Sequence, residues 1–297
     1  MQTSITSERL LINPLTTNDN KFIFELVNTD GWLKYIGDRD IHSLEDALSY
    51  INKVISNPKI NYWTVRLKHY DTPIGIISLV KRDYLTCPDI GFAFLPSFAS
   101  NGYAYEAAKA TLRHIIDTTD HAYIFGVTIH ENIPSIKLLI KLGLTFQKDV
   151  EVDNEKLRVY EVSTDKLHIS AITESFFRVF TNKNGTQANL DMLNNICIPQ
   201  VLIINRKKPE TNIYNLTSFT EPRKKMLSDG TLMEFEEKEI YEETKVFSNI
   251  AHRYSEYEKS GVLNGKQFKQ KGHKLFQFVK IDKSWKINSV IWEDDES

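Results

Sequence analysis

The segment that most constrains the fold is a short glycine-containing loop between an apolar run and a helical pattern. Residues 90–95 form a continuous apolar run, which is typical of a buried strand. Beyond the loop, apolar residues recur with helical spacing at Ala104, Ala107, Ala108, Leu112 and Ile115. A strand, a tight loop and a helix in this order direct free backbone N–H groups toward an anion. Gly102 has no side chain, so a phosphate group can approach the backbone there closely.

Strand and helix patterns alternate along the first half of the chain. Ser43 is a good N-cap for a helix, and Pro134 suits the first turn of another. We expect strands at residues 10–15, 62–67, 74–80, 90–95, 123–129, 144–150 and 157–162, and helices at 19–27, 44–55, from 103 and from 134. This order predicts an α/β domain.

The polar stretch Ser163–Lys166 predicts a domain boundary, with domains at residues 1–165 and 167–297. The second half begins with helical patterns and then becomes rich in strands. We expect helices at 169–180 and 188–196, and strands at 232–242, 245–257, 274–281 and 284–292. Ser260-Gly261 and Asn264-Gly265 indicate a loop between two of these strands. Helices followed by antiparallel strands predict an α+β cone, in which a curved sheet wraps around a helix.

Composition and charge exclude several classes of function. The net charge of −2 leaves no electrostatic footprint for nucleic acid. We expect no membrane partner, because no apolar run approaches the length that spans a bilayer. The two cysteines, Cys87 and Cys197, lie far apart, and with no signal-peptide pattern they indicate a reducing, cytoplasmic location. No His/Cys cluster has metal-ligand spacing, so we expect no metal site.

Three segments together resemble the acetyl-CoA-binding core of the GNAT N-acetyltransferases: residues 101–108, 132–144 and 7–15. The branch that acetylates ribosomal-protein and other protein N-termini is the most similar. The resemblance implies a mixed sheet with flanking helices. It also implies transfer of an acetyl group from acetyl-CoA to a primary amine, by direct attack on the thioester.

The resemblance places the cofactor's pyrophosphate on the backbone of Ser100, Asn101, Gly102, Tyr103 and Ala104. Two residues depart from the family pattern: Ala99 stands where a Gln or Arg is usual, and Ser100 where many relatives have glycine. Backbone N–H groups do not depend on side-chain identity, so the loop can still bind. The departures also leave open a degenerate protein that only binds acyl-CoA, as a sensor or scaffold.

The remaining cofactor contacts come from the strand before the loop and from the second block. The resemblance implies that backbone N–H groups of Phe92, Phe94 and Leu95 hold the thioester arm, and that Asn132 holds pantetheine. Asn132 can equally be a helix N-cap.

Proton transfers in the resembled mechanism need an acid and a base. Ser135 is the candidate that protonates the leaving thiolate, and Asp89 is the candidate general base. Ser135 can equally be a first-turn helix residue, and Asp89 a solvated residue at a strand start. Other candidates are Tyr103 and Tyr105 as acids and His130 and Glu131 as bases. Trp32, Leu33, Tyr35 and Ile36 either line the acceptor side or anchor the core.

The second half resembles the NTF2-like (SnoaL-like) family, through Phe176-Phe177, the long final strands and the closing segment Trp285–Trp292. This resemblance implies a ligand-binding module or a homodimer formed through the second domain. His252 and Glu256 share a strand face, which leaves open a small hydrolase or isomerase.

Overall fold

The computed structural model describes residues 3–207 and 209–296. They form two compact units that divide between Leu167 and His168, inside helix α6 (Thr164–Arg178). The polar stretch at 163–166 is not a loop, because strand β8 (Glu155–Ser163) passes directly into α6.

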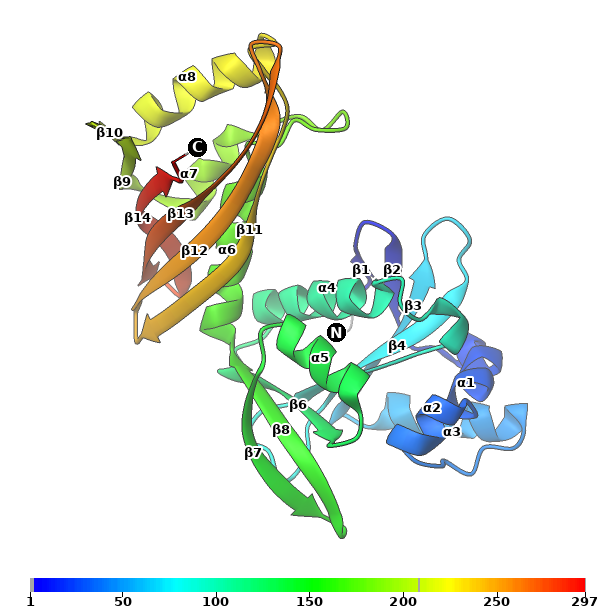
Figure 1. Ribbon diagram of the computed structural model, residues 1–297. Coiled ribbons are helices and arrows are strands. Elements are labelled where there is room, and N and C mark those ends of the chain that lie inside the picture. Colours follow the sequence, from blue (N-terminus) through cyan, green and yellow to red (C-terminus); the bar gives the residue numbers. More distant parts are fainter. Residues whose placement is uncertain (1–2, 208, 297) are drawn as a thin grey trace. The chain divides into compact units, whose positions relative to one another are not determined.

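The first unit is built on an eight-stranded sheet of order β1-β2-β3-β4-β5-β6-β8-β7 (Figure 1). The other strands are β1 (Ile5–Thr6), β2 (Leu10–Pro14), β3 (Ile60–Leu67), β4 (Pro73–Val80), β5 (Asp89–Phe94), β6 (Tyr123–Ile129) and β7 (Thr145–Val152). The helices are η1 (Thr17–Asp19), α1 (Asn20–Val27), α2 (Asp30–Tyr35), α3 (Leu44–Ser56), η2 (Pro96–Phe98), α4 (Tyr103–Thr118) and α5 (Ile133–Lys141). The mixed α/β architecture expected for this half is confirmed.

Helices cover both faces of this sheet, because apolar side chains of its central strands point alternately to the two faces and are buried on each. In β4, Ile77 packs in the cluster that includes Leu112 of α4, whereas Ile76 packs with Ile51 of α3. The predicted caps are present: the Ser43 side chain accepts a hydrogen bond from the Asp46 backbone N–H, and Pro134 lies in the first turn of α5.

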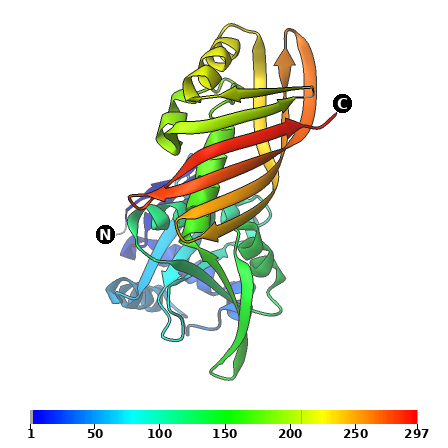
Figure 2. The ribbon, with the colours of Figure 1, turned by 90° about the vertical axis from the view of Figure 1, so that its left-hand side faces the viewer.

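The second unit is a six-stranded sheet of order β10-β9-β14-β13-β12-β11. The strands are β9 (Cys197–Lys207), β10 (Glu210–Tyr214), β11 (Leu232–Phe247), β12 (Ile250–Leu263), β13 (Lys266–Ile281) and β14 (Ser284–Asp294). Strands β9 and β14 are parallel and the other neighbours are antiparallel. Besides α6, the unit contains η3 (Leu190–Met192), α7 (Leu193–Ile196) and α8 (Leu216–Ser228). Figure 2 shows the sheet curving in front of α6.

Several expectations for this half are wrong in detail. The runs at 232–242 and 245–257 are not two strands divided at 243–244, because β11 continues to Phe247 and the chain turns at Ser248. Asn264-Gly265 does form a turn, but Ser260-Gly261 lies within β12. A Cβ on Gly261 would lie 3.1 Å from the Met233 carbonyl oxygen, so this glycine allows close strand contact. The expected helix at 188–196 is only η3 and α7, and β9, β10 and α8 were not expected.

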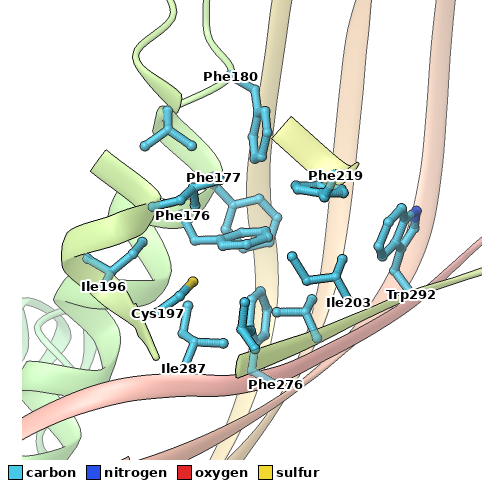
Figure 3. Close-up of a cluster of buried hydrophobic side chains, with 14 of the residues drawn as sticks. Phe176, Phe177, Phe180, Ile196, Cys197, Ile203, Phe219, Phe276, Ile287 and Trp292 are labelled. Carbon is cyan, nitrogen blue, oxygen red and sulfur yellow. The ribbon is translucent and has the colours of Figure 1, made fainter. Parts of the chain in front are cut away.

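Aromatic side chains fill the space between α6 and the sheet of the second unit (Figure 3). Phe176 of α6 meets Phe276 of β13 edge to face, with ring centroids 5.2 Å apart. Phe177 also contacts Phe276, and Phe278 stacks against Phe276. Such pairs add to the large apolar area that each ring buries.

Candidate active site

The most distinctive feature of the first unit is a wedge between β5 and β6. These parallel strands pair only at Asp89 and Phe125, where the Phe125 N–H donates to the Pro88 carbonyl oxygen. Beyond that point the strands diverge, whereas β5 pairs with β4 along its whole length. Beyond Asp89, this edge of β5 therefore has no strand partner among residues 3–207 and 209–296.

The direction of each β5 amide follows from its register with β4. The Leu95 N–H donates to the Ile74 carbonyl oxygen, so Leu95 faces β4. Because the N–H groups of successive residues in a strand point to opposite edges, those of Phe92 and Phe94 face the wedge. The Leu95 amide is already engaged, which reduces the predicted set of donors on this strand to Phe92 and Phe94.

The loop after β5 presents backbone amides at the start of α4. Gly102 is the N-cap, with φ of 79°, and Ser100 also has a positive φ of 63°. Gly102 has no side chain with which to cap the helix. The first backbone hydrogen bond of α4 runs from the Glu106 N–H to the Gly102 carbonyl oxygen, and in the described chain the N–H groups of residues 102–105 have no acceptor. These four groups are available to an anion.

The residue that the sequence reasoning missed is Arg9, just before β2. Its Nε donates to Glu106 Oε2 at 2.7 Å, and its Nη1 donates to the Asn101 carbonyl oxygen at 3.2 Å. Its guanidinium also lies over the Tyr103 ring, 4.5 Å from the centroid. A Cβ built on Gly102 would lie 3.6 Å from Arg9 Nη2. A positive charge therefore lies beside the loop, although position 99 carries none.

Glu106 holds Arg9 in this position. Its carboxylate accepts three bonds: from the Arg9 N–H at 2.8 Å, from Arg9 Nε and from Ser7 Oγ at 2.7 Å. Burial of Glu106 raises its pKa, but these hydrogen bonds outweigh it and the pKa is lowered overall. The Glu106 partner raises the pKa of Arg9.

Asn132 and Ser135 lie at the beginning of α5, on the other side of the wedge. Asn132 is the N-cap, and its Oδ1 accepts from the Ser135 N–H at 3.2 Å. The helix-cap interpretation is therefore confirmed. Among the described residues, Asn132 Nδ2 has no acceptor and Ser135 Oγ has no partner. Gly126 allows α5 to pack closely, because a Cβ there would lie 2.4 Å from Leu139 Cδ2.

Asp89 lies at the closed end of the wedge and is only 2% exposed. The alternative of a solvated strand-start residue is therefore wrong. Its carboxylate accepts from Arg82, with Nε to Oδ1 at 2.8 Å and Nη2 to Oδ2 at 3.3 Å. Burial raises the pKa of Asp89, and the Arg82 charge opposes this shift.

Among the other candidates, Tyr105 and His130 each contact a charged side chain. The Tyr105 ring lies under Lys141 Nζ, at 4.4 Å. His130 Nε2 is 3.3 Å from Asp149 Oδ1. Trp32 is buried in the core, whereas Leu33 and Ile36 are exposed. A cavity of about 250 Å³ between α3 and β3 contains none of the predicted site residues.

No helix in residues 3–207 or 209–296 is both long and apolar enough to cross a bilayer. Within the same ranges, no group of three or more His, Cys, Asp or Glu side chains is arranged to hold a metal ion.

The Arg9–Glu106 contact predicts a pH-dependent contribution to stability. A lowered carboxylate pKa stabilises the fold above the unfolded pKa of about 4.5, and this contribution disappears as the pH falls through the folded value. Glu106→Gln should therefore reduce the free energy of unfolding by about 1 kcal/mol at neutral pH, and much less at about pH 3. Urea unfolding at both pH values measures this. The exposed control Glu25→Gln should change neither value, and an equal loss for Glu106→Gln at both would contradict the account.

Comparison with known proteins agrees with this geometry. Residues 9–145 match the family model described as an acetyltransferase (GNAT) domain. YnaD of Bacillus subtilis, named as an uncharacterised N-acetyltransferase, is 30% identical over 155 residues, covering 51% of this chain and 90% of YnaD. YoaA of the same organism, named likewise, is 25% identical over 149 residues, which is 48% of this chain and 82% of YoaA.

A crystal structure of a GCN5-related N-acetyltransferase from Brucella melitensis shares the fold, with a TM-score of 0.51 and 13% identity. The match covers 59% of this chain and 85% of that one. The free loop amides, the open edge of β5 and the adjacent Arg9 fit a phosphate-bearing ligand with an extended arm. Through its first unit, the chain belongs to the GNAT acetyltransferase family, whose acyl donor is acetyl-CoA.

Proposed function

We propose that residues 1–165 form an N-acetyltransferase domain that moves an acetyl group from acetyl-CoA to a primary amine. The observation that carries this proposal is the wedge between β5 and β6, with free amides on one edge and an uncapped helix N-terminus at its mouth. An extended pantetheine arm would add to β5 like a further strand. Its pyrophosphate would then meet the amides at 102–105.

The reaction forms one bond and breaks another at the thioester carbon. The neutral amine attacks that carbon, the C–S bond breaks, and the departing thiolate takes a proton. N–H groups of Phe92 and Phe94 would stabilise the carbonyl oxygen, as in an oxyanion hole. Asn132 Nδ2 would hold the arm, and Ser135 would supply the proton to sulfur.

The phosphate-loop assignment predicts a selective loss of acetyl-CoA affinity. Gly102→Val places a β-branched residue at φ 79° beside the free amides, and affinity should fall at least about tenfold. Gly185→Val is the matched control, since Gly185 also has a positive φ, of 75°, and an added Cβ there would have nothing within 4 Å. Calorimetric titration with acetyl-CoA measures both variants. Unchanged affinity in Gly102→Val would exclude this loop as the phosphate site.

We also propose that Arg9 replaces the side-chain donor absent at Ala99. Arg9→Met should weaken acetyl-CoA binding about tenfold and make the remaining affinity less sensitive to salt, because a charge near the phosphates is lost. Arg9→Lys should restore part of the affinity. Arg113 lies exposed on α4, so Arg113→Met serves as the control. An unaltered salt dependence in Arg9→Met would limit Arg9 to packing.

Asp89 is our proposed base, acting through water because Arg82 occupies both of its oxygens. Asp89→Asn should lower kcat about a hundredfold and leave acetyl-CoA affinity unchanged. Arg82→Met breaks the same ion pair but keeps the carboxylate, and it should retain more activity than Asp89→Asn. Steady-state thiol release with an amine panel measures both variants. Equal losses would show that only the ion pair matters.

The acceptor we propose is a primary amine, on a protein N-terminus or on a small molecule. The similarity of residues 7–15 to the branch that acetylates ribosomal-protein and other N-termini favours the first. The departures at Ala99 and Ser100 favour a second candidate, an acyl-CoA-binding sensor. Acetyl-CoA binding without thiol release for any amine would support it. The free cysteines, Cys87 and Cys197, suit the cytoplasmic location that we propose.

For residues 167–297 we propose an NTF2-like domain that binds a ligand or forms a homodimer. The curved sheet around α6 and the order of its strands support this assignment. The outward face of the sheet carries a row of neighbouring apolar side chains. Leu275 of β13 pairs with Ile291 of β14 and with Tyr254 of β12, and Ile291 pairs with Ile204 of β9. Leu275 is 51% exposed and Ile291 is 40% exposed.

If a dimer buries this row, a charged side chain introduced there should weaken self-association. Leu275→Asp should shift the protein to the monomer in sedimentation experiments, because it puts a carboxylate at the centre of the row. Phe247→Asp changes another exposed apolar residue, outside the row, and should leave the assembly as it is. A wild-type monomer at high concentration would argue against the dimer.

A further inference from the structure

The second unit contains a cavity of about 630 Å³, partly open to solvent, between α8, α6 and the sheet. Aromatic rings supply much of its wall, among them Phe180, Phe219, Phe235, Phe268 and Trp292. Figure 3 shows Phe219 between Phe180 and Trp292, and the centroid distances are 5.9 and 5.8 Å. A largely apolar cavity of this size with a few polar groups is typical of small-molecule sites.

Two ion pairs stand in the polar part of the wall. Lys274 Nζ lies 2.5 Å from Glu237 Oε1, and both side chains are less than a tenth exposed. Lys259 Nζ lies 2.5 Å from Asp294 Oδ1. Each pair cancels its own charge. They therefore offer polar contacts to a ligand but do not select its net charge.

Arg223 of α8 is the remaining charge in the wall. Its guanidinium lies 3.9 Å from the Phe219 ring centroid, and Nη1 donates to the Phe219 carbonyl oxygen at 2.9 Å. In the described parts of the chain, no carboxylate lies within ion-pair distance of it. Burial lowers the pKa of Arg223. Arg223 is partly buried, and the attraction of Glu237 offsets only part of its loss of hydration, so a ligand anion would stabilise the guanidinium further.

We propose that this cavity binds a small amphiphilic carboxylate, with a flat apolar body among the aromatic rings and its carboxylate on Arg223. The planar guanidinium matches a carboxylate through paired N–H donors. With three cations and two anions in the wall, the cavity carries one excess positive charge, which suits a monoanion. The proposal specifies the ligand-binding role suggested above for the second unit and does not depend on acetyl transfer.

The test compares two probes of nearly the same size and shape: 1-naphthaleneacetate, which is an anion, and its neutral amide, in which an NH2 group replaces one carboxylate oxygen. Titration of the full chain by calorimetry should show the acid binding at least tenfold more tightly than the amide. Arg223→Met should abolish this preference and leave amide binding nearly unchanged. The control Lys225→Met, on the same helix but outside the cavity wall, should keep the preference.

Circular dichroism checks that each variant is folded. If Arg223→Met does not fold, Arg223→Lys replaces it, and its preference for the acid should fall at least threefold because the planar donor pair is lost. The proposal is overturned if the wild-type chain binds neither probe, binds both equally, or keeps its preference in the folded Arg223 variant. Acetyl-CoA titration of the same samples should give wild-type affinity, so a failure of the first unit would be recognised separately.

Discussion

The divergence of β5 from β6 is the constraint on which the first unit depends. Parallel strands normally satisfy one another's backbone groups along their length, but these pair only at Asp89 and Phe125. The consequence is an open edge whose amides, at Phe92 and Phe94, need an external partner. The buried Asp89, paired with the partly exposed Arg82, lies at the closed end, and the loop with its free amides begins at the open end. One local departure from regular pairing thus creates the wedge, with an ion pair at its closed end and free amides at its open end.

The loop and Arg9 show how distant segments complete this arrangement. Positive φ at Ser100 and Gly102 turns the chain so that α4 begins at the groove. Arg9 reaches the same loop from the turn between β1 and β2, held there by the Glu106 carboxylate. Glu106 thereby links the first strands of the sheet to the first turn of α4. The charge beside the loop comes from tertiary structure rather than from the loop sequence.

The sequence predicted the first half well because its signals are local. Apolar runs, the cap at Ser43 and the glycine before α4 each act within a few residues. The contact of Arg9 with the loop could not be predicted, since 92 residues separate Arg9 from Asn101. In the second half, the expected strands at 232–242 and 245–257 left out Glu243 and Thr244. They lie instead in β11, where Glu242 pairs with the buried Arg253 of β12. The cavity around Arg223 likewise depends on α8, which has weak periodicity and contains Pro222.

Amide hydrogen exchange with and without acetyl-CoA tests the central claim most directly. The account predicts slower exchange at Phe92, Phe94 and residues 102–105 in the presence of acetyl-CoA, because those N–H groups gain acceptors. Leu95 should not change, since its N–H already donates to Ile74. Slower exchange elsewhere in the first unit, with no change at the wedge or the loop, would contradict the assignment of the wedge as the acetyl-CoA site.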